Sequence, residues 1–169
     1  MPKYTLPEMD APAFQDLPAF VQGYIQAMFF TNQSCIPMVD FHTEESQRLI
    51  REGQADGCLP QDAGFLDLHP DALAEIVRDC VEFQKAAAVP LSYVLAIHAG
   101  APLYSEEQAG IDFWYTRNHH GVGYWDRGLG ALGDQLTEIA HKAGEVDPWF
   151  SEEPDESSPT GYGFVYHSM

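Results

Sequence analysis

The sequence predicts an α+β fold in which three main helices pack on a short antiparallel sheet. Apolar residues recur at helical spacing in three long segments. The segment 112–125 places aromatic and β-branched residues on both sides of an Asn-His-His-Gly turn, which is typical of a hairpin. Residues 161–167 form a further strand-like run. We therefore expect the sheet to consist of the hairpin 112–125 and this C-terminal strand.

Length and composition indicate one globular domain that covers residues 1–169. The 169 residues include 45% hydrophobic and 12% aromatic residues, enough to build a core. No apolar run has the length needed to cross a bilayer, and the first residues lack an apolar signal core. We expect a soluble, cytoplasmic protein. The three cysteines contain no C-x-x-C pair, so neither a disulfide framework nor a zinc knuckle is indicated.

The first half of the chain supplies two of the main helices. Residues 1–15 are rich in Pro and Ala and are expected to be an extended arm. Asp16 is a good N-cap for an amphipathic helix at 16–31. After an irregular stretch that contains a short helix at 43–52, capped by Thr43, the apolar stripe of 70–98 predicts a helical unit kinked by a proline.

The second half supplies the predicted sheet and the third main helix. A capping-box sequence starts a short helical turn at 105–108, and the hairpin follows. Asp126 is expected to cap a helix that Gly144 ends. Residues 145–160 are rich in acids and are expected to form a solvated loop before the last strand.

Net charge is the strongest global signal. Twenty-six acidic residues oppose eight basic ones, for a formal charge of −18. Such a field disfavours direct binding of nucleic acid or of an anionic membrane surface, and it favours a basic partner. A folded acidic protein can occupy a DNA-binding groove by presenting carboxylates where phosphates would lie. The alternative is that the acids keep the protein soluble or adapt it to high salt.

The hairpin and the residues just after it are the candidate binding site. Arg117 and Arg127 stand out in so acidic a chain, although each could instead form a structural ion pair with Asp112 or Asp126. Asp112 and His120 are candidate catalytic residues, but no spacing specifies a reaction. The candidate binding residues are Trp114, Arg117, Asn118, His119, His120, Tyr124, Trp125 and Arg127.

Two further patterns bear on metals and cofactors. Asp40, His42 and Glu44 alternate, so on an extended segment they would share one face and could hold a metal, or they could simply be a solvated strand end. Residues 128–133 fit G-x-G-x-x-G, but no parallel βαβ unit surrounds them. We therefore expect no nucleotide cofactor, and a close packing of the helix start on the hairpin instead.

The segment 110–128 also resembles a motif of short, mostly uncharacterised proteins from tailed bacteriophages. The shared residues are Gly110, Asp112-Phe113-Trp114, Thr116-Arg117-Asn118, His120-Gly121, Gly123 and Trp125-Asp126-Arg127-Gly128. The helix that follows is similar too, and the likeness covers the last third of the chain. The sequence departs from the motif at Ile111 and His119, where a polar and a small residue are expected. The resemblance implies a phage origin, and therefore action in the cytoplasm of a host cell.

These observations lead to three functional hypotheses. The first is a non-enzymatic, phage-type accessory protein that binds a basic or DNA-binding host protein through an acidic, DNA-like surface. The second is a small metal-binding protein or hydrolase centred on residues 112–127. The third is a structural or self-assembling module, such as a homodimer, whose aromatic patch is the interface.

Overall fold

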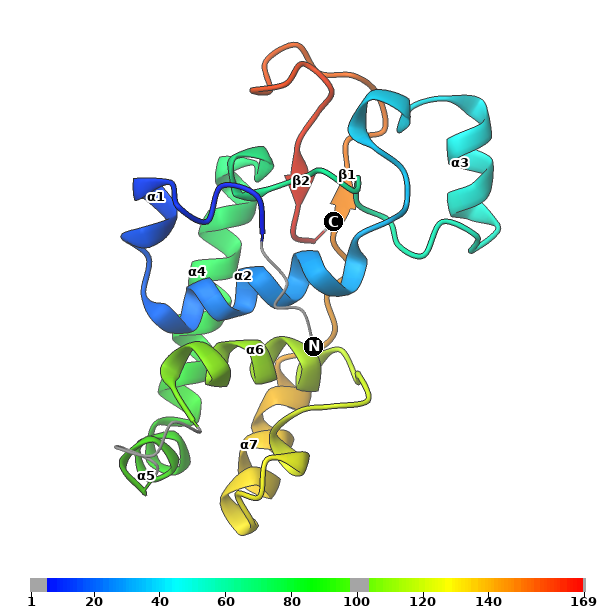
Figure 1. Ribbon diagram of the computed structural model, residues 1–169. Coiled ribbons are helices and arrows are strands. Elements are labelled where there is room, and N and C mark those ends of the chain that lie inside the picture. Colours follow the sequence, from blue (N-terminus) through cyan, green and yellow to red (C-terminus); the bar gives the residue numbers. More distant parts are fainter. Residues whose placement is uncertain (1–5, 98–103, 169) are drawn as a thin grey trace. The chain divides into compact units, whose positions relative to one another are not determined.

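The computed structural model describes residues 6–97 and 104–168, and these form two compact units (Figure 1). Unit 1 holds residues 6–15, 28–75 and 147–168, and unit 2 holds residues 16–27, 76–97 and 104–146. The helices α2 (Ala19–Asn32) and α4 (Pro70–Ala86) contribute residues to both units. The prediction of a single domain stays a prediction, and each unit is described below by itself.

Unit 2 is a cluster of helices around an aromatic core. Besides its parts of α2 and α4 it contains α5 (Ala88–Ile97), α6 (Glu106–Arg117), the 3-10 turn η3 (Tyr124–Asp126) and α7 (Ala131–Lys142). The helices α5 and α6 and the turn η3 all pack against α7. The ring of Phe83 stacks on Phe113 with centroids 4.0 Å apart, and Tyr124 stacks on the same ring at 5.9 Å. The two rings that stack on Phe83 therefore both come from the segment 106–126.

Helices α2 and α6 of unit 2 meet at their backbones. A Cβ added at Gly110 would lie 1.8 Å from the carbonyl oxygen of Phe20, and one added at Gly23 would lie 2.0 Å from that of Glu107. Only residues without a side chain fit two helices this close. The two glycines therefore fix where α6 crosses α2.

Unit 1 contains little regular structure. It includes α1 (Pro12–Gln15), η1 (Met38–Asp40), α3 (Glu44–Arg51), η2 (Phe65–Asp67), β1 (Trp149–Phe150) and β2 (Val165–Tyr166). The strands β1 and β2 pair antiparallel with Trp149 opposite Tyr166. Aromatic side chains fill the interior, among them Phe14 packed edge-on against Phe65 and Phe41 edge-on against Phe150.

The predicted α+β class is wrong, because the described residues form seven α-helices and a single two-stranded pairing. The predicted hairpin at 112–125 does not exist. Residues 106–117 are one helix, which Ser105 caps by accepting a hydrogen bond from the backbone N–H of Gln108 at 3.1 Å. Ser105 therefore starts a helix as predicted, but the Gln108 side chain donates to Asp112 instead of completing a capping box, and the helix runs past Gly110 instead of ending there.

Other sequence predictions are confirmed or need smaller corrections. Thr43 caps α3 by accepting from the N–H of Ser46 at 3.2 Å, as predicted. The third main helix begins at Ala131, while Asp126 ends η3 and accepts from the N–H of Gly123. The predicted acidic loop contains β1, and the C-terminal strand pairs with β1 rather than with a hairpin. Part of the arm 1–15 lies outside the described residues.

The helical unit predicted at 70–98 consists of α4 and α5, which are bent by 84° relative to each other. The break falls at Ala87, three residues before Pro90. A proline ring clashes with the carbonyl four residues earlier, so the helix breaks there and Pro90 lies in the first turn of α5, where its missing N–H costs nothing. Residue 98 lies outside the described residues.

Among the described residues no single helix is both long and apolar enough to cross a membrane. Only the bent pair α4 and α5, taken together, passes that test by length and composition.

Candidate functional site

Arg117 lies at the centre of unit 2 and is 3% exposed. Its guanidinium donates to the Asp79 carboxylate and the Tyr24 hydroxyl, both at 2.9 Å. It also donates to the carbonyl oxygens of Ala143 and Gly144 at 3.1 and 2.8 Å. One side chain therefore joins α2, α4 and α6 to the end of α7. The predicted structural ion pair is present, although its carboxylate comes from Asp79 and not from the neighbouring aspartates.

Asp112 and Arg127 form the second network. The Arg127 Nε and Nη2 donate to the Asp112 carboxylate at distances of 2.7 to 3.1 Å. The same carboxylate accepts from the Tyr104 hydroxyl and the Gln108 amide. Burial raises the pKa of Asp112, and the charge and hydrogen bonds of Arg127 oppose that rise. Both oxygens of this candidate catalytic group are occupied in holding α6 to the segment after η3.

The aromatic residues of the candidate site are mostly internal. Trp114 is buried and packs edge-on against Tyr24 at 5.2 Å. Tyr124 is buried too, and its hydroxyl donates to the carbonyl of Ala109 at 2.6 Å. Trp125 is the exception, with 42% of its surface exposed. The motif 110–128 thus acts mainly as an internal framework for unit 2.

The loop after α6 retains a small exposed surface. Asn118 turns inward: its amide donates to the carbonyl of Trp114 and accepts from the N–H of Val146 at 2.8 Å. His119 is exposed and stacks on His141 with centroids 4.4 Å apart. Its φ of +55° lies in the left-handed region that favours glycine, a physical reason for a small residue at this position. Partial burial lowers the pKa of His120, which favours its neutral form.

The structure does not bring the predicted metal ligands together. Asp40 ends η1, Glu44 starts α3, and the His42 Nε2 lies 2.8 Å from the carbonyl oxygen of Ser151. The segment is not extended, so its alternating residues do not share a face. Across residues 6–97 and 104–168, no three His, Cys, Asp or Glu side chains lie close enough to one another to hold a metal ion.

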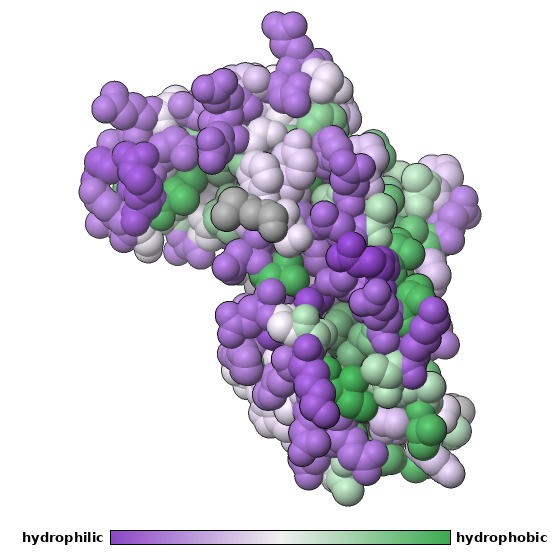
Figure 2. Space-filling view, turned by 180° about the vertical axis from the view of Figure 1, so that it is seen from behind, coloured by the Kyte–Doolittle hydropathy of each residue, from purple (hydrophilic) through white to green (hydrophobic). Residues whose placement is uncertain are grey.

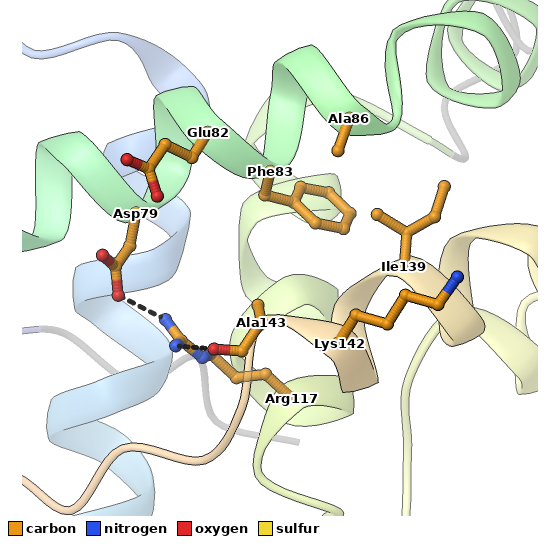
Figure 3. A pocket seen from close by; sticks show the side chains of 8 residues that line it. All are labelled: Asp79, Glu82, Phe83, Ala86, Arg117, Ile139, Lys142 and Ala143. Carbon is orange, nitrogen blue, oxygen red and sulfur yellow. Dashed lines mark hydrogen bonds and ion pairs between the residues drawn. The ribbon is translucent and has the colours of Figure 1, made fainter.

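Unit 2 contains a cavity of about 410 Å³ beside the Arg117 network (Figure 3). Phe83 and Ile139 face each other across it, while Asp79 and Glu82 lie on α4 and Lys142 lies on α7. The hydrogen bonds of Arg117 run to Asp79 and Ala143 at its edge. The lining offers apolar contact and charge, and it contains no hydroxyl, thiol or imidazole group.

The acidic residues are concentrated in unit 1. Its described residues contain sixteen acids and two bases, a formal charge of −14, whereas unit 2 contains ten acids and five bases, a formal charge of −5. The two bases, Arg48 and Arg51, both lie on α3. Arg48 is already paired with Glu45 and Glu52 at 2.6 Å. The negative field of the chain therefore belongs mainly to unit 1.

Sequence reasoning missed a second cavity, an open surface hollow of about 460 Å³ on unit 1. Trp149, Ser151, Glu152, Glu153 and Tyr166 line it. The signal was present in the sequence, since a tryptophan within an acidic stretch has no core to fill if that stretch is only a solvated loop. No family model, curated protein or solved structure matches this chain.

Proposed function

We propose that this protein is a non-enzymatic binding protein whose acidic unit 1 binds a basic, DNA-binding protein. The charge distribution carries the proposal. Most of the negative charge lies on one unit, and the only two bases among that unit's described residues share one short helix. A field of one sign attracts a basic surface and speeds its association, and it repels the phosphates of nucleic acids.

The exposure of the acids supports the same proposal. Of the sixteen acids in the described part of unit 1, thirteen are exposed, while Asp67 is buried and Glu75 and Asp155 are partly buried. Exposed carboxylates remain hydrated and ionised, and they can replace the phosphates that a DNA-binding surface normally contacts. A partner with a DNA-binding groove therefore fits this surface better than a partner with a neutral surface.

The resemblance to tailed-bacteriophage proteins supports a bacterial host protein as the partner. In that setting the protein is an accessory factor in the host cytoplasm that acts on host defence or host machinery. The motif that carries the resemblance builds the core of unit 2 through Arg117, Asp112 and Tyr124. The proposal therefore assigns the motif a structural role and assigns binding to unit 1.

Salt and DNA competition test this proposal. Basic proteins would be captured from a bacterial lysate on the immobilised protein and then challenged with NaCl or with duplex DNA. Because the contacts are between exposed charges, the captured protein should elute as NaCl rises from about 0.1 to about 0.5 M, and duplex DNA should displace it. An empty capture, or a partner that both treatments leave bound, contradicts the proposal.

Two variants with the same net charge locate the surface. Asp10→Asn, Asp40→Asn and Glu156→Gln neutralise three exposed acids of unit 1. The control, Asp16→Asn, Asp134→Asn and Glu138→Gln, neutralises three exposed acids of unit 2. The first triple variant should retain several-fold less of the partner, and the second should retain nearly all of it. Equal losses would show that only net charge matters.

Self-association is a second candidate function, and α5 favours it. Val89, Tyr93 and Ile97 are each more than half exposed along one side of this helix, and its ten residues include no charge. Figure 2 shows hydrophobic residues at the surface in the region of α5 (lower right). Two copies of an acidic chain can meet at such a face without opposing their carboxylates. The face of α5 would then be self-complementary.

Sedimentation at two salt concentrations tests this candidate. Dimerisation through α5 should strengthen as salt screens the repulsion between copies, whereas binding to a basic partner should weaken. Tyr93→Glu should abolish the dimer, and Tyr162→Glu, an exposed site on unit 1, should leave it intact. A monomer under both conditions would remove this candidate and leave the first unaffected.

A further inference from the structure

The cavity on unit 1 is built on a stack of aromatic rings. Trp149 and Tyr166 face each other across the pairing of β1 and β2, with centroids 4.2 Å apart and planes 12° from parallel. The other side of the stack is His69, whose ring lies 4.9 Å from that of Tyr166 at 22°. The Trp149 Nε1 donates to the carbonyl of Ser168 at 3.4 Å. The orientation of the Trp149 ring is therefore fixed by the strands and by this hydrogen bond.

Two carboxylates stand beside these rings. Glu152 and Glu153 line the cavity together with Trp149, Ser151 and Tyr166, and both are exposed. The lining includes no basic residue. An aromatic face next to carboxylates attracts a cation by two interactions: the ring quadrupole attracts its charge, and the carboxylates pair with it directly. A neutral or anionic group would gain neither.

We propose that this cavity receives an arginine side chain of the basic partner. The inference rests on the proposed function and gives it a specific contact. A guanidinium is planar, so it can stack on an aromatic ring while its N–H groups point outward to a carboxylate. A lysine ammonium is a compact, strongly hydrated point charge that cannot do both in the same way. The chemistry of the lining therefore distinguishes arginine from lysine, which net charge alone cannot.

Three peptides that differ at one residue type serve as probes. They are a Gly-Ser peptide with several arginines, the same peptide with lysines, and the same peptide with citrullines, which keep the shape of arginine without its charge. Amide and indole N–H signals would be followed by NMR as each peptide is added. The arginine peptide should shift the Trp149 indole signal and bind several-fold more tightly than the lysine peptide. The citrulline peptide should not shift it.

The two other tryptophans are internal controls. Trp114 is buried in unit 2 and Trp125 is exposed there, so neither indole signal should follow the Trp149 titration. If the arginine peptide shifts all exposed indoles alike, the contact is non-specific and the inference fails.

Variants separate the rings from the carboxylates. Glu152→Gln with Glu153→Gln should weaken the arginine peptide at least fivefold. Asp134→Asn with Glu138→Gln on α7 makes the same change in net charge and should alter the affinity less than twofold. Trp149→Leu should remove the preference for arginine over lysine. Trp149→Phe keeps a ring between the strands and should retain part of that preference, even if the leucine variant does not fold.

The outcomes distinguish this inference from the proposed function. If arginine and lysine peptides bind equally while the unmodified protein still captures its lysate partner, the arginine site is refuted and the acidic surface stands. If the unit 1 triple variant retains its partner, the proposed function fails whatever the peptides show.

Discussion

The two arginines of the motif are structural braces, because the groups that accept their hydrogen bonds lie within unit 2. Arg117 donates to a carboxylate, a hydroxyl and two carbonyls, and Arg127 donates to the buried carboxylate of Asp112 through two of its nitrogens. A guanidinium whose N–H groups already donate to protein acceptors is poorly suited to binding a ligand. The residues of the motif thus stabilise the unit, and substituting them should lower the free energy of unfolding.

Arg117→Met should strongly destabilise unit 2. It leaves the Asp79 carboxylate and the carbonyls of Ala143 and Gly144 without their buried partner, which typically costs about 3–5 kcal/mol. Urea unfolding followed by circular dichroism would measure the loss. Arg78→Met removes an exposed arginine from the same aspartate and should cost less than about 1 kcal/mol. Similar losses for both variants would contradict the assignment of Arg117 as a brace.

Asp67 should make the stability of the protein depend on pH. Burial, and then the charges of Glu8 and Asp62, raise the pKa of Asp67 to about 6, although the N–H of Gly64 opposes the shift by donating to it. A carboxyl whose pKa is higher in the folded state stabilises folding at low pH, and that stability is lost as pH rises from about 4 through 6.

Asp67→Asn keeps the acceptor for Gly64 and removes the titration. Compared with the unmodified protein, it should gain up to about 3 kcal/mol in the free energy of unfolding between pH of about 4 and about 7. Urea unfolding at several pH values would show the difference. The exposed Asp71→Asn serves as the control for the removal of one negative charge. A constant difference between Asp67→Asn and the unmodified protein would disprove the role of Asp67.

At the scale of elements, the crossing of α2 and α6 depends on two glycines. Gly110→Ala should destabilise the protein by about 1–3 kcal/mol, because its Cβ would overlap the carbonyl of Phe20. The sign of the change in stability is informative, since replacing glycine by alanine within a helix otherwise stabilises it by about 1 kcal/mol. Gly121→Ala, where the added Cβ meets nothing within 4 Å, should be nearly neutral in the same thermal unfolding experiment. A more stable Gly110→Ala would mean that the helices can separate freely.

The sequence predicted those helices that have one apolar face and a capping residue, as α3 with Thr43 illustrates. It failed at α6, because this helix is buried on nearly all sides. Asp112, Phe113, Trp114, Thr116 and Arg117 are all buried, so no period of 3.6 can be seen in them. Their aromatic and β-branched character then favoured a strand. Only the tertiary contacts with α2, α4 and α7 reveal the helix.

The candidate site was predictable only in part, for a related reason. Charge and residue type identified the motif, but they could not show that Trp114 and Tyr124 lie inside while Trp125 lies outside. The stack of Trp149 on Tyr166 joins residues far apart in the sequence through a pairing of only two residues per strand. A pairing that short has no alternating pattern from which to infer it.

At the scale of the whole molecule, the uneven charge should make stability depend on salt. In the described part of unit 1 only two bases oppose sixteen acids, so the acids repel one another, and salt screens that repulsion. The melting temperature should rise by about 3–6 °C between about 0.02 and 0.5 M NaCl. The unit 1 triple variant should show a smaller rise than the unit 2 triple variant. A melting temperature that falls with salt would indicate that attractive ion pairs dominate instead.

The division of the chain between the two units also sets an order of events during synthesis. Unit 2 draws on residues 16–27 and 76–146, whereas unit 1 needs residues 147–168 as well as stretches near the start of the chain. The braced helices can therefore assemble once residue 146 has left the ribosome. The strand that completes the Trp149 and Tyr166 stack follows residue 146 in the chain and emerges after it. The proposed arginine site is thus absent until after the helices of unit 2 have been synthesised, so a nascent chain cannot engage a partner at that site before then.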